Sequence, residues 1–102
     1  MRIVVIGAGV VGFHLARELS SEGHDITVVD SDPALIRRIE ERMDVLAISG
    51  DASCPSVLDG AGIGGADLAI AVTDSDTTNL VVSLIAKKAG ARKSIVRVRN
   101  PE

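Results

Sequence analysis

The sequence predicts an α/β fold with a Rossmann-like, doubly wound parallel sheet, and three observations along its 102 residues support this. Short runs rich in Val and Ile alternate with longer stretches that carry apolar residues at helical spacing. A glycine-rich loop follows the first run, and an acidic residue ends the second. Right-handed crossovers then favour the strand order 3-2-1-4-5. We expect a single domain, residues 1–102, truncated before the sixth strand of a complete fold.

The first strand and helix lie at the start of the chain. Ile3–Ile6 is a run of β-branched residues, as in a central parallel strand covered on both faces. A helix is expected from Val10 to Ser21, and Gly23 is a natural stop for it. The inward face of this helix is expected to carry Val11, Leu15, Ala16 and Leu19.

The second strand and helix follow directly. Ile26–Val29 is the next strand. Asp32 suits the N-cap of a helix, and Pro33 suits its first position, because the missing N–H of proline would have no helical partner there. The helix is expected to run to about Arg42.

The second half of the chain repeats the alternation. Further strands are expected at Val45–Ile48, Leu68–Val72 and Ile95–Val98. A short helical turn is expected to begin near Pro55, and a longer helix to run from Ser75 or Asp76 to Gly90.

Composition excludes several kinds of function. Phe13 is the single aromatic residue and the formal net charge is −3, so nothing favours nucleic-acid binding. Cys54 is the only cysteine, and His14 and His24 lack metal-ligand spacing, so we expect neither an intrachain disulfide nor a metal site. The apolar run Ile3–Phe13 contains three glycines and is too short to cross a bilayer, so we expect no direct membrane insertion.

The loop Gly7-Ala8-Gly9-Val10-Val11-Gly12 fits the G-x-G-x-x-G pattern of dinucleotide-binding folds. Its glycines permit a tight turn, a close backbone approach to a pyrophosphate and close packing of helix on strand. The helix that begins here points unpaired N–H groups and the positive end of its dipole at the phosphates. Glycines also serve ordinary turns, but this position between strand and helix favours a ligand site.

Asp30 ends the second strand, about twenty residues after the loop, where a carboxylate can accept hydrogen bonds from both ribose hydroxyls. It would repel a 2′-phosphate, so NAD(H) or an adenine nucleotide with a free ribose is favoured over NADP. Ser31 is expected at the same site. A capping role for Asp30 is the weaker interpretation, because Ser31 and Asp32 can cap the next helix.

Polar segments also follow the third and fourth strands, at the same edge of the sheet. Asp51 and Ala52 are expected beside the adenine. Thr73 and Asp74 are expected beside the far half of a dinucleotide or the terminal phosphates of ATP. Each segment has a structural alternative, a turn with a capping serine in the first case and a helix N-cap in the second, and the sequence leaves these open.

Several segments together resemble the N-terminal domain of Trk potassium-uptake regulatory subunits, also described as the TrkA-N, RCK or KTN domain. The matching segments, in order along the chain, are VVIGAGVVG, DITVVDSD, GDAS, AVTDSDTTNL and VRVRNPE. The glycine loop is shared with many dehydrogenases, whereas TDSDxTNL and RVRNPE are much more specific.

The resemblance implies a cytoplasmic regulatory module that binds NAD(H), or alternatively ATP/ADP. Its implied partner is a membrane potassium transporter or channel subunit, which it would gate. The resemblance also implies that the regulatory protein is a homo-oligomer, a dimer that assembles into a ring in the full-length protein. It also places Arg97 near the nucleotide cleft. Family members often carry Arg or Gln where this chain has Val10, and many carry an acidic residue where it has Thr77. Because the longer side chain is absent at Val10, the resemblance implies weaker recognition of the γ-phosphate of ATP.

Two other functions compete with a non-catalytic sensor. The chain could be the cofactor-binding fragment of an NAD-dependent oxidoreductase, but no catalytic acid or base and no substrate domain emerges from the sequence. A methyltransferase also uses a glycine loop and an acid after the second strand, but it has no place for the TDSDxTNL and RVRNPE segments. We therefore expect a sensor that is not an enzyme.

Overall fold

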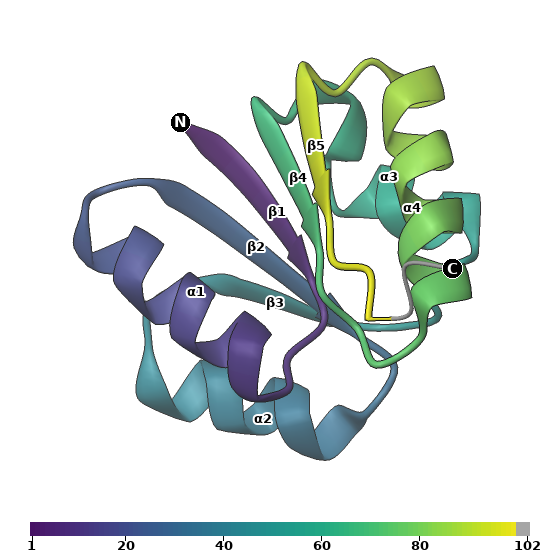
Figure 1. Cartoon of the computed structure of the whole chain (residues 1–102). Helices are drawn as coiled ribbons and strands as arrows, with labels where there is room; N and C mark the ends of the chain where they lie inside the picture. The colour runs from purple at the N-terminus through teal and green to yellow at the C-terminus, as the bar shows by residue number, and fades with distance from the viewer. Residues whose placement is uncertain (100–102) are drawn as a thin grey trace.

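The computed structural model describes residues 1–99 and contains a five-stranded, wholly parallel sheet (Figure 1). Its order is β3-β2-β1-β4-β5, which confirms the predicted topology. The strands are β1 (Arg2–Ile6), β2 (Asp25–Asp30), β3 (Leu46–Ser49), β4 (Leu68–Ala71) and β5 (Lys93–Val96). The helices are α1 (Val10–Ser21), α2 (Pro33–Arg42), α3 (Pro55–Gly60), the 3-10 turn η1 (Ile63–Gly65) and α4 (Asp76–Ala89).

Helices cover both faces of the sheet: α1 and α2 lie on one face, and α3 and α4 on the other (Figure 1). The alternation of side chains along β1 builds the two cores. Ile3 and Val5 pack in the cluster under α1 and α2, whereas Val4 and Ile6 pack in the cluster under α3 and α4. This two-sided burial explains why β1 is a continuous apolar run.

The inward face of α1 differs from the prediction at one position. Val11 is 39% exposed, and the buried residues of the helix are Gly12, Phe13 and Ala16. The first turn packs against the backbone of the glycine loop, with Gly12 beside the carbonyl of Gly7. Val11 is therefore rotated toward solvent. The predicted inward positions Leu15 and Leu19 are half-buried against the core.

The bounds of all five strands differ from the prediction by one or two residues: β1 starts one residue earlier, at Arg2, and β2 is one residue longer at each end, Asp25–Asp30. The third strand starts and ends one residue later, at Leu46–Ser49, and the fourth ends one residue earlier, at Ala71. The fifth is Lys93–Val96, because its pairing with β4 runs from Leu68↔Lys93 to Ala71↔Val96. Of the expected strand residues beyond it, Val98 is 48% exposed.

The solvent-facing side of α4 carries large apolar side chains. Leu80 is 52% exposed and Leu84 is 69% exposed, while Val82 and Ala86 pack against the sheet.

The last residues of the RVRNPE segment, 100–102, lie outside the described part of the chain. Among residues 1–99, no helix has the length and apolarity needed to cross a membrane.

Candidate nucleotide-binding site

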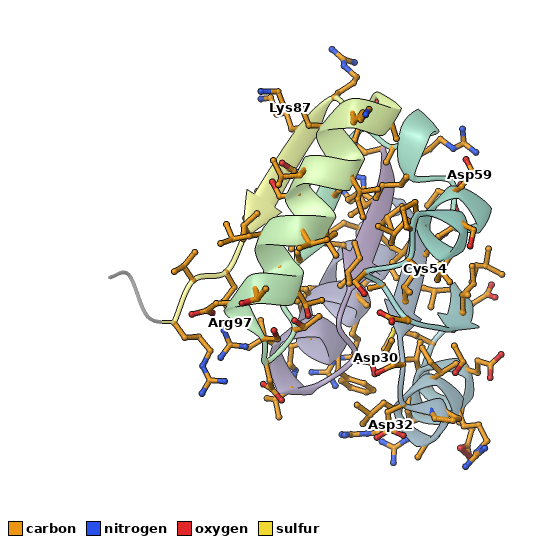
Figure 2. All side chains as sticks on the ribbon, turned by 90° about the vertical axis from the view of Figure 1, so that its right-hand side faces the viewer. Asp30, Asp32, Cys54, Asp59, Lys87 and Arg97 are labelled. Carbon is orange, nitrogen blue, oxygen red and sulfur yellow. The ribbon has the colours of Figure 1, made fainter. Side chains whose placement is uncertain are left out.

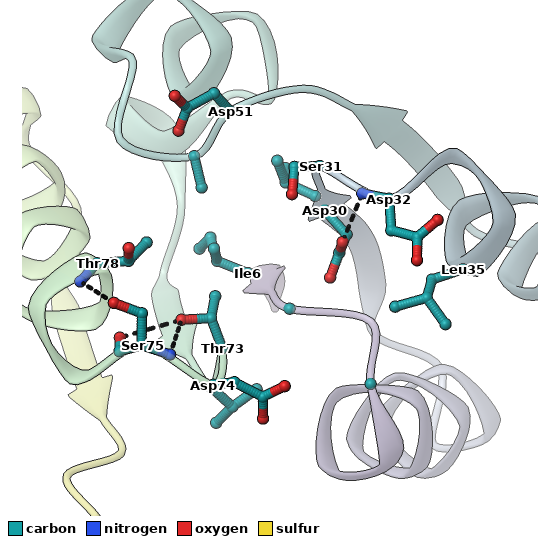
Figure 3. Close-up of a pocket in the computed structure, with 15 residues that line it drawn as sticks. Ile6, Asp30, Ser31, Asp32, Leu35, Asp51, Thr73, Asp74, Ser75 and Thr78 are labelled. Carbon is teal, nitrogen blue, oxygen red and sulfur yellow. Dashed lines mark hydrogen bonds between the residues drawn. The ribbon is translucent and has the colours of Figure 1, made fainter.

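A pocket of about 380 Å³ opens at the carboxyl edge of the sheet, where the loops after β1, β2, β3 and β4 converge (Figure 3). This is the edge at which parallel α/β sheets bind their ligands, since the strand order reverses between β1 and β4. The pocket is lined by Ile6, Gly7, Gly9, Val29, Asp30, Ser31, Asp32, Leu35, Asp51, Ala52, Val72, Thr73, Asp74, Ser75 and Thr78.

The loop after β1 brings bare backbone to the floor of the pocket. Gly7 has a φ of 114°, and a Cβ there would lie 2.9 Å from the backbone carbonyl of Val72. Gly9 is the N-cap of α1, and no side chain caps it. A Cβ on Gly9 would meet nothing within 4 Å, so this residue leaves open space in the pocket. The first turn of α1 therefore presents uncapped N–H groups next to that space, as an anion site requires.

Asp30, at the end of β2, joins two of the pocket loops. Its Oδ2 accepts a hydrogen bond of 2.8 Å from the backbone N–H of Ala8 in the glycine loop. Its Oδ1 accepts one of 2.8 Å from the N–H of Asp32 (Figure 3). Asp32 in turn accepts from the N–H of Ala34 and caps α2, as predicted from its place before Pro33. Each carboxylate oxygen of Asp30 has a second acceptor site that can receive a ligand hydroxyl.

Asp51 forms the rim of the pocket after β3. Its Oδ1 accepts from both the N–H and the Oγ–H of Ser53, at 2.9 Å and 2.7 Å. These hydrogen bonds hold the pKa of the Asp51 carboxyl below its usual value, the side-chain bond most strongly. Asp51 is therefore ionised at neutral pH. Ala52 beside it is buried and lines the pocket.

The loop after β4 forms the opposite wall. Thr73 is held by Asn79: the Oδ1 of Asn79 accepts from the N–H of Thr73 at 2.9 Å and from its Oγ1 at 2.7 Å. Ser75 caps α4 by accepting from the N–H of Thr78 at 3.1 Å (Figure 3). The predicted capping role of this segment is present, and the same residues line the pocket.

The predicted binding residues divide into two groups. Those that line the pocket are Gly7, Gly9, Asp30, Ser31, Asp51, Ala52, Thr73 and Asp74. Those that do not are Ala8, Val10, Val11, Gly12 and Arg97. Ala8 is buried and contributes its N–H to Asp30, and Gly12 packs under the loop. Val10 is 73% exposed.

Several lining residues were missed by the sequence reasoning. Ile6, Val29 and Val72 were assigned only to strands, although each is the last apolar residue before a pocket loop. Leu35, in the first turn of α2, lines the pocket as well. The signal that finds all four is position at the carboxyl end of a strand or the start of the next helix.

Among the described residues, the pocket lining carries four carboxylates and no lysine or arginine side chain: the acids are Asp30, Asp32, Asp51 and Asp74. Positive potential in this lining comes from backbone N–H groups and the dipole of α1. Within residues 1–99, no group of three or more His, Cys, Asp or Glu side chains could hold a metal ion. The site is thus suited to a ligand of modest negative charge with hydroxyls for the acids.

These features define the chain as a Rossmann-like α/β domain with a candidate ligand pocket at the carboxyl edge of its sheet. The TrkA-N domain model matches residues 3–102, and the chain belongs to the TrkA-N domain family. A Trk system potassium uptake protein TrkA homolog from Archaeoglobus fulgidus is 48% identical over 102 residues, which are all of this chain and 23% of that protein. Trk system potassium uptake protein TrkA from Vibrio alginolyticus is 38% identical over all of this chain and 22% of its own length. The chain thus spans less than a quarter of these relatives.

The fold also matches solved structures. The NAD(P)-binding domain of an exopolyphosphatase-related protein from Archaeoglobus fulgidus superposes with a TM-score of 0.84 at 25% identity. That match covers 97% of this chain and 74% of the solved chain.

Proposed function

We propose that this chain is a regulatory module of a potassium transport system, which binds NAD(H) in the pocket at the carboxyl edge of the sheet. The observation that carries the proposal is Asp30, which lies beside the glycine loop with acceptor sites left for ribose hydroxyls. The relatives named as Trk potassium uptake proteins, and the likeness to an NAD(P)-binding domain, support the ligand and the system.

The charge of the pocket favours a dinucleotide over a triphosphate. The diphosphate of NAD(H) can lie at the N-terminus of α1, with the nicotinamide half toward Thr73 and Asp74. The γ-phosphate of ATP would instead approach Asp74, and the basic side chain beside that carboxylate, Arg99 at 3.4 Å, is outside the pocket lining and already paired with Asp74. ATP and ADP are therefore the second candidates, and a divalent cation would be needed to screen the triphosphate.

A titration series tests this order of ligands. At fixed ionic strength, we expect NAD⁺ and NADH to bind more tightly than ATP without Mg²⁺. NADP⁺ is expected to bind at least about tenfold more weakly than NAD⁺, because its 2′-phosphate would face Asp30. Adding Mg²⁺ should improve the affinity for ATP and leave that for NAD⁺ unchanged. Calorimetry provides the dissociation constants, with S-adenosylmethionine included to test the methyltransferase alternative.

Two results would contradict the ligand assignment. Failure of every nucleotide in the series to bind would remove the central claim. Binding of ATP without Mg²⁺ as tight as that of NAD⁺ would show that the four carboxylates do not select against the triphosphate.

We further propose that the module is not an enzyme. It would act in the cytoplasm, at the inner face of the membrane, by changing conformation as its nucleotide changes. Such a sensor needs only a difference in affinity between two conformations. Its partner would be a membrane potassium transporter or channel subunit, and the full-length protein would assemble as a homo-oligomer. The alternative is the cofactor-binding part of an NAD-dependent oxidoreductase. Steady consumption of NADH by the full-length protein with a small substrate would favour that alternative.

A further inference from the structure

Asn79 is a buried polar residue that ligand binding itself does not explain. It lies in the second turn of α4, its side chain is fully buried, and it does not line the pocket. It is the only buried polar or charged residue identified among residues 1–99. A buried amide is costly unless its hydrogen bonds are made, so its partners indicate its role.

The amide of Asn79 joins two segments that are far apart in the sequence. Its Oδ1 accepts twice from Thr73, as described above, and its Nδ2 donates to the carbonyl of Thr73 at 3.1 Å. The same Nδ2 donates to the carbonyl of Arg97 at 3.1 Å. Thr73 faces the pocket, whereas Arg97 directly follows β5. All four hydrogen-bonding positions of the amide are thus used, three on Thr73 in the pocket loop and one on Arg97 in the segment beyond the last strand.

The neighbouring residues make two more links between the same segments. The N–H of Arg99 donates to Oδ1 of Asp76 at 3.0 Å, and the guanidinium of Arg99 lies 3.4 Å from Oδ1 of Asp74. Asp74 lines the pocket. Arg97 and Asp30 lie at the same end of the molecule, the carboxyl edge of the sheet (Figure 2). The exposed ion pair contributes little by itself, whereas the hydrogen bond from Asn79 to Arg97 is made by a fully buried amide and is costly to lose. The N–H of Arg97 in turn donates to the carbonyl of Ala71, at the end of β4, at 3.0 Å.

We propose that Asn79 is a positioning residue that couples Thr73 in the pocket to residues 97–99, so that nucleotide binding changes the segment that follows β5. The inference rests on the proposed function, because it requires a ligand that contacts the Thr73 side of the pocket. Coupling of this kind is reciprocal: holding residues 97–99 in place would also change the affinity for nucleotide by the same factor.

Amide hydrogen exchange measured residue by residue tests the coupling. In the wild-type chain, saturating NAD⁺ is expected to slow exchange of the Arg97 amide by about fivefold or more, although Arg97 does not line the pocket. In Asn79→Ala, NAD⁺ should still protect the amides of the glycine loop but leave the rate at Arg97 unchanged. A purely structural role for Asn79 would not abolish this ligand-dependent difference in a folded variant.

Ser83→Ala is the matched control. Ser83 lies one turn further along α4 and also links that helix to β5, through a contact of 3.3 Å between its Oγ and that of Ser94. Ser83 does not line the pocket, so this variant should keep the full response of Arg97 to NAD⁺. Loss of the response in Ser83→Ala as well would overturn the specific role of Asn79.

The remaining outcomes are also decisive. If NAD⁺ protects the glycine loop in the wild-type chain but not Arg97, the coupling is wrong and the proposed function stands; this holds even if Asn79→Ala fails to fold. If no nucleotide binds, the proposed function fails, and the link that Asn79 makes between Thr73 and Arg97 is tested without ligand. Faster amide exchange at both Thr73 and Arg97 in Asn79→Ala than in Ser83→Ala would then support the link. Faster exchange at Thr73 alone would overturn it.

Discussion

Replacement of Gly12 by alanine is expected to destabilise the fold by about 3 kcal/mol or more, which is a large part of the stability of a domain of this size. A Cβ at Gly12 would overlap the carbonyl oxygen of Gly7 and would lie 2.7 Å from its carbonyl carbon. Both atoms belong to the backbone of the glycine loop, so no side-chain rotation can relieve the contact.

The loop has little freedom to move away from such a Cβ. Gly7 itself lies against the backbone of Val72, and its N–H donates to the carbonyl of Val29 at 2.8 Å. The Ala8 N–H is held by Asp30. Accommodating a methyl group on Gly12 therefore requires α1 to shift off the sheet, which opens the packing of the helix on its core.

Thermal or urea unfolding measures the loss, and Gly9→Ala is its control within the same loop. We expect the Gly12 variant to melt more than about 10 °C below the wild-type chain. Gly9 has a φ of −71°, and its Cβ would meet open space, so the Gly9 variant should retain its stability within about 0.5 kcal/mol. It should nevertheless bind NAD⁺ more weakly, because the methyl group projects where the phosphates approach. Equal stability of the two variants would contradict the close packing at Gly12.

The topology could be predicted because it depends on patterns that are local in sequence. Alternation of β-branched runs with amphipathic stretches specifies parallel strands and right-handed crossovers, and these fix the order found in the sheet. The helix caps could be predicted in the same way: Asp32 is the N-cap of α2 and Ser75 is the N-cap of α4.

The structure differs from the prediction where contacts between residues far apart in the sequence determine the ends of a strand or the exposed face of a helix. Among residues 1–99, β5 pairs with β4 alone, so its ends are set by that pairing and not by its own apolar residues. The outward rotation of Val11 depends on the fit of α1 against the Gly7 backbone, which periodicity alone does not reveal.

The loops of the candidate site could be predicted from the sequence, but the residues and contacts that hold these loops in place could not. Asp30 and Asp51 each follow a strand, so sequence places them at the ligand edge. Asn79 lies within a helical pattern, and its partners at Thr73 and Arg97 are 6 and 18 residues away. Nothing local distinguishes it from a solvent-facing asparagine. The contact of Asp30 with Ala8, 22 residues away, is equally invisible in the sequence.

Asp30→Ala is expected to lower the affinity for NAD⁺ by about a hundredfold while the chain remains folded. Hydrogen bonds to a charged group contribute about 1.5–3 kcal/mol each, and two ribose hydroxyls would lose their acceptor. The variant also frees the N–H groups of Ala8 and Asp32, so the glycine loop loses its anchor to β2. We expect a lower melting temperature as well, but a smaller loss than in Gly12→Ala.

Asp30→Asn separates the charge from the anchoring. The amide oxygen can still accept from Ala8, which keeps the glycine loop in place, but the negative charge is gone and the amide nitrogen cannot accept from the N–H of Asp32. We expect the affinity for NAD⁺ to fall by about tenfold and the preference for NAD⁺ over NADP⁺ to narrow, because the repulsion of a 2′-phosphate is removed.

Asp32→Ser is the control for a general effect of charge. It removes a carboxylate from the same pocket wall, and serine can still cap α2. If Asp30 acts by hydrogen bonding to the ribose, this variant should bind NAD⁺ within about threefold of the wild-type chain, since no such bond is lost. Calorimetric titration of the variants with NAD⁺ and NADP⁺ decides the matter. Equal losses of NAD⁺ affinity in the Asp32 and Asp30 variants would contradict a specific role for Asp30 in binding the ribose. Only a difference between two acids on the same pocket wall can show that the position of the carboxylate, and not its charge alone, selects the ligand.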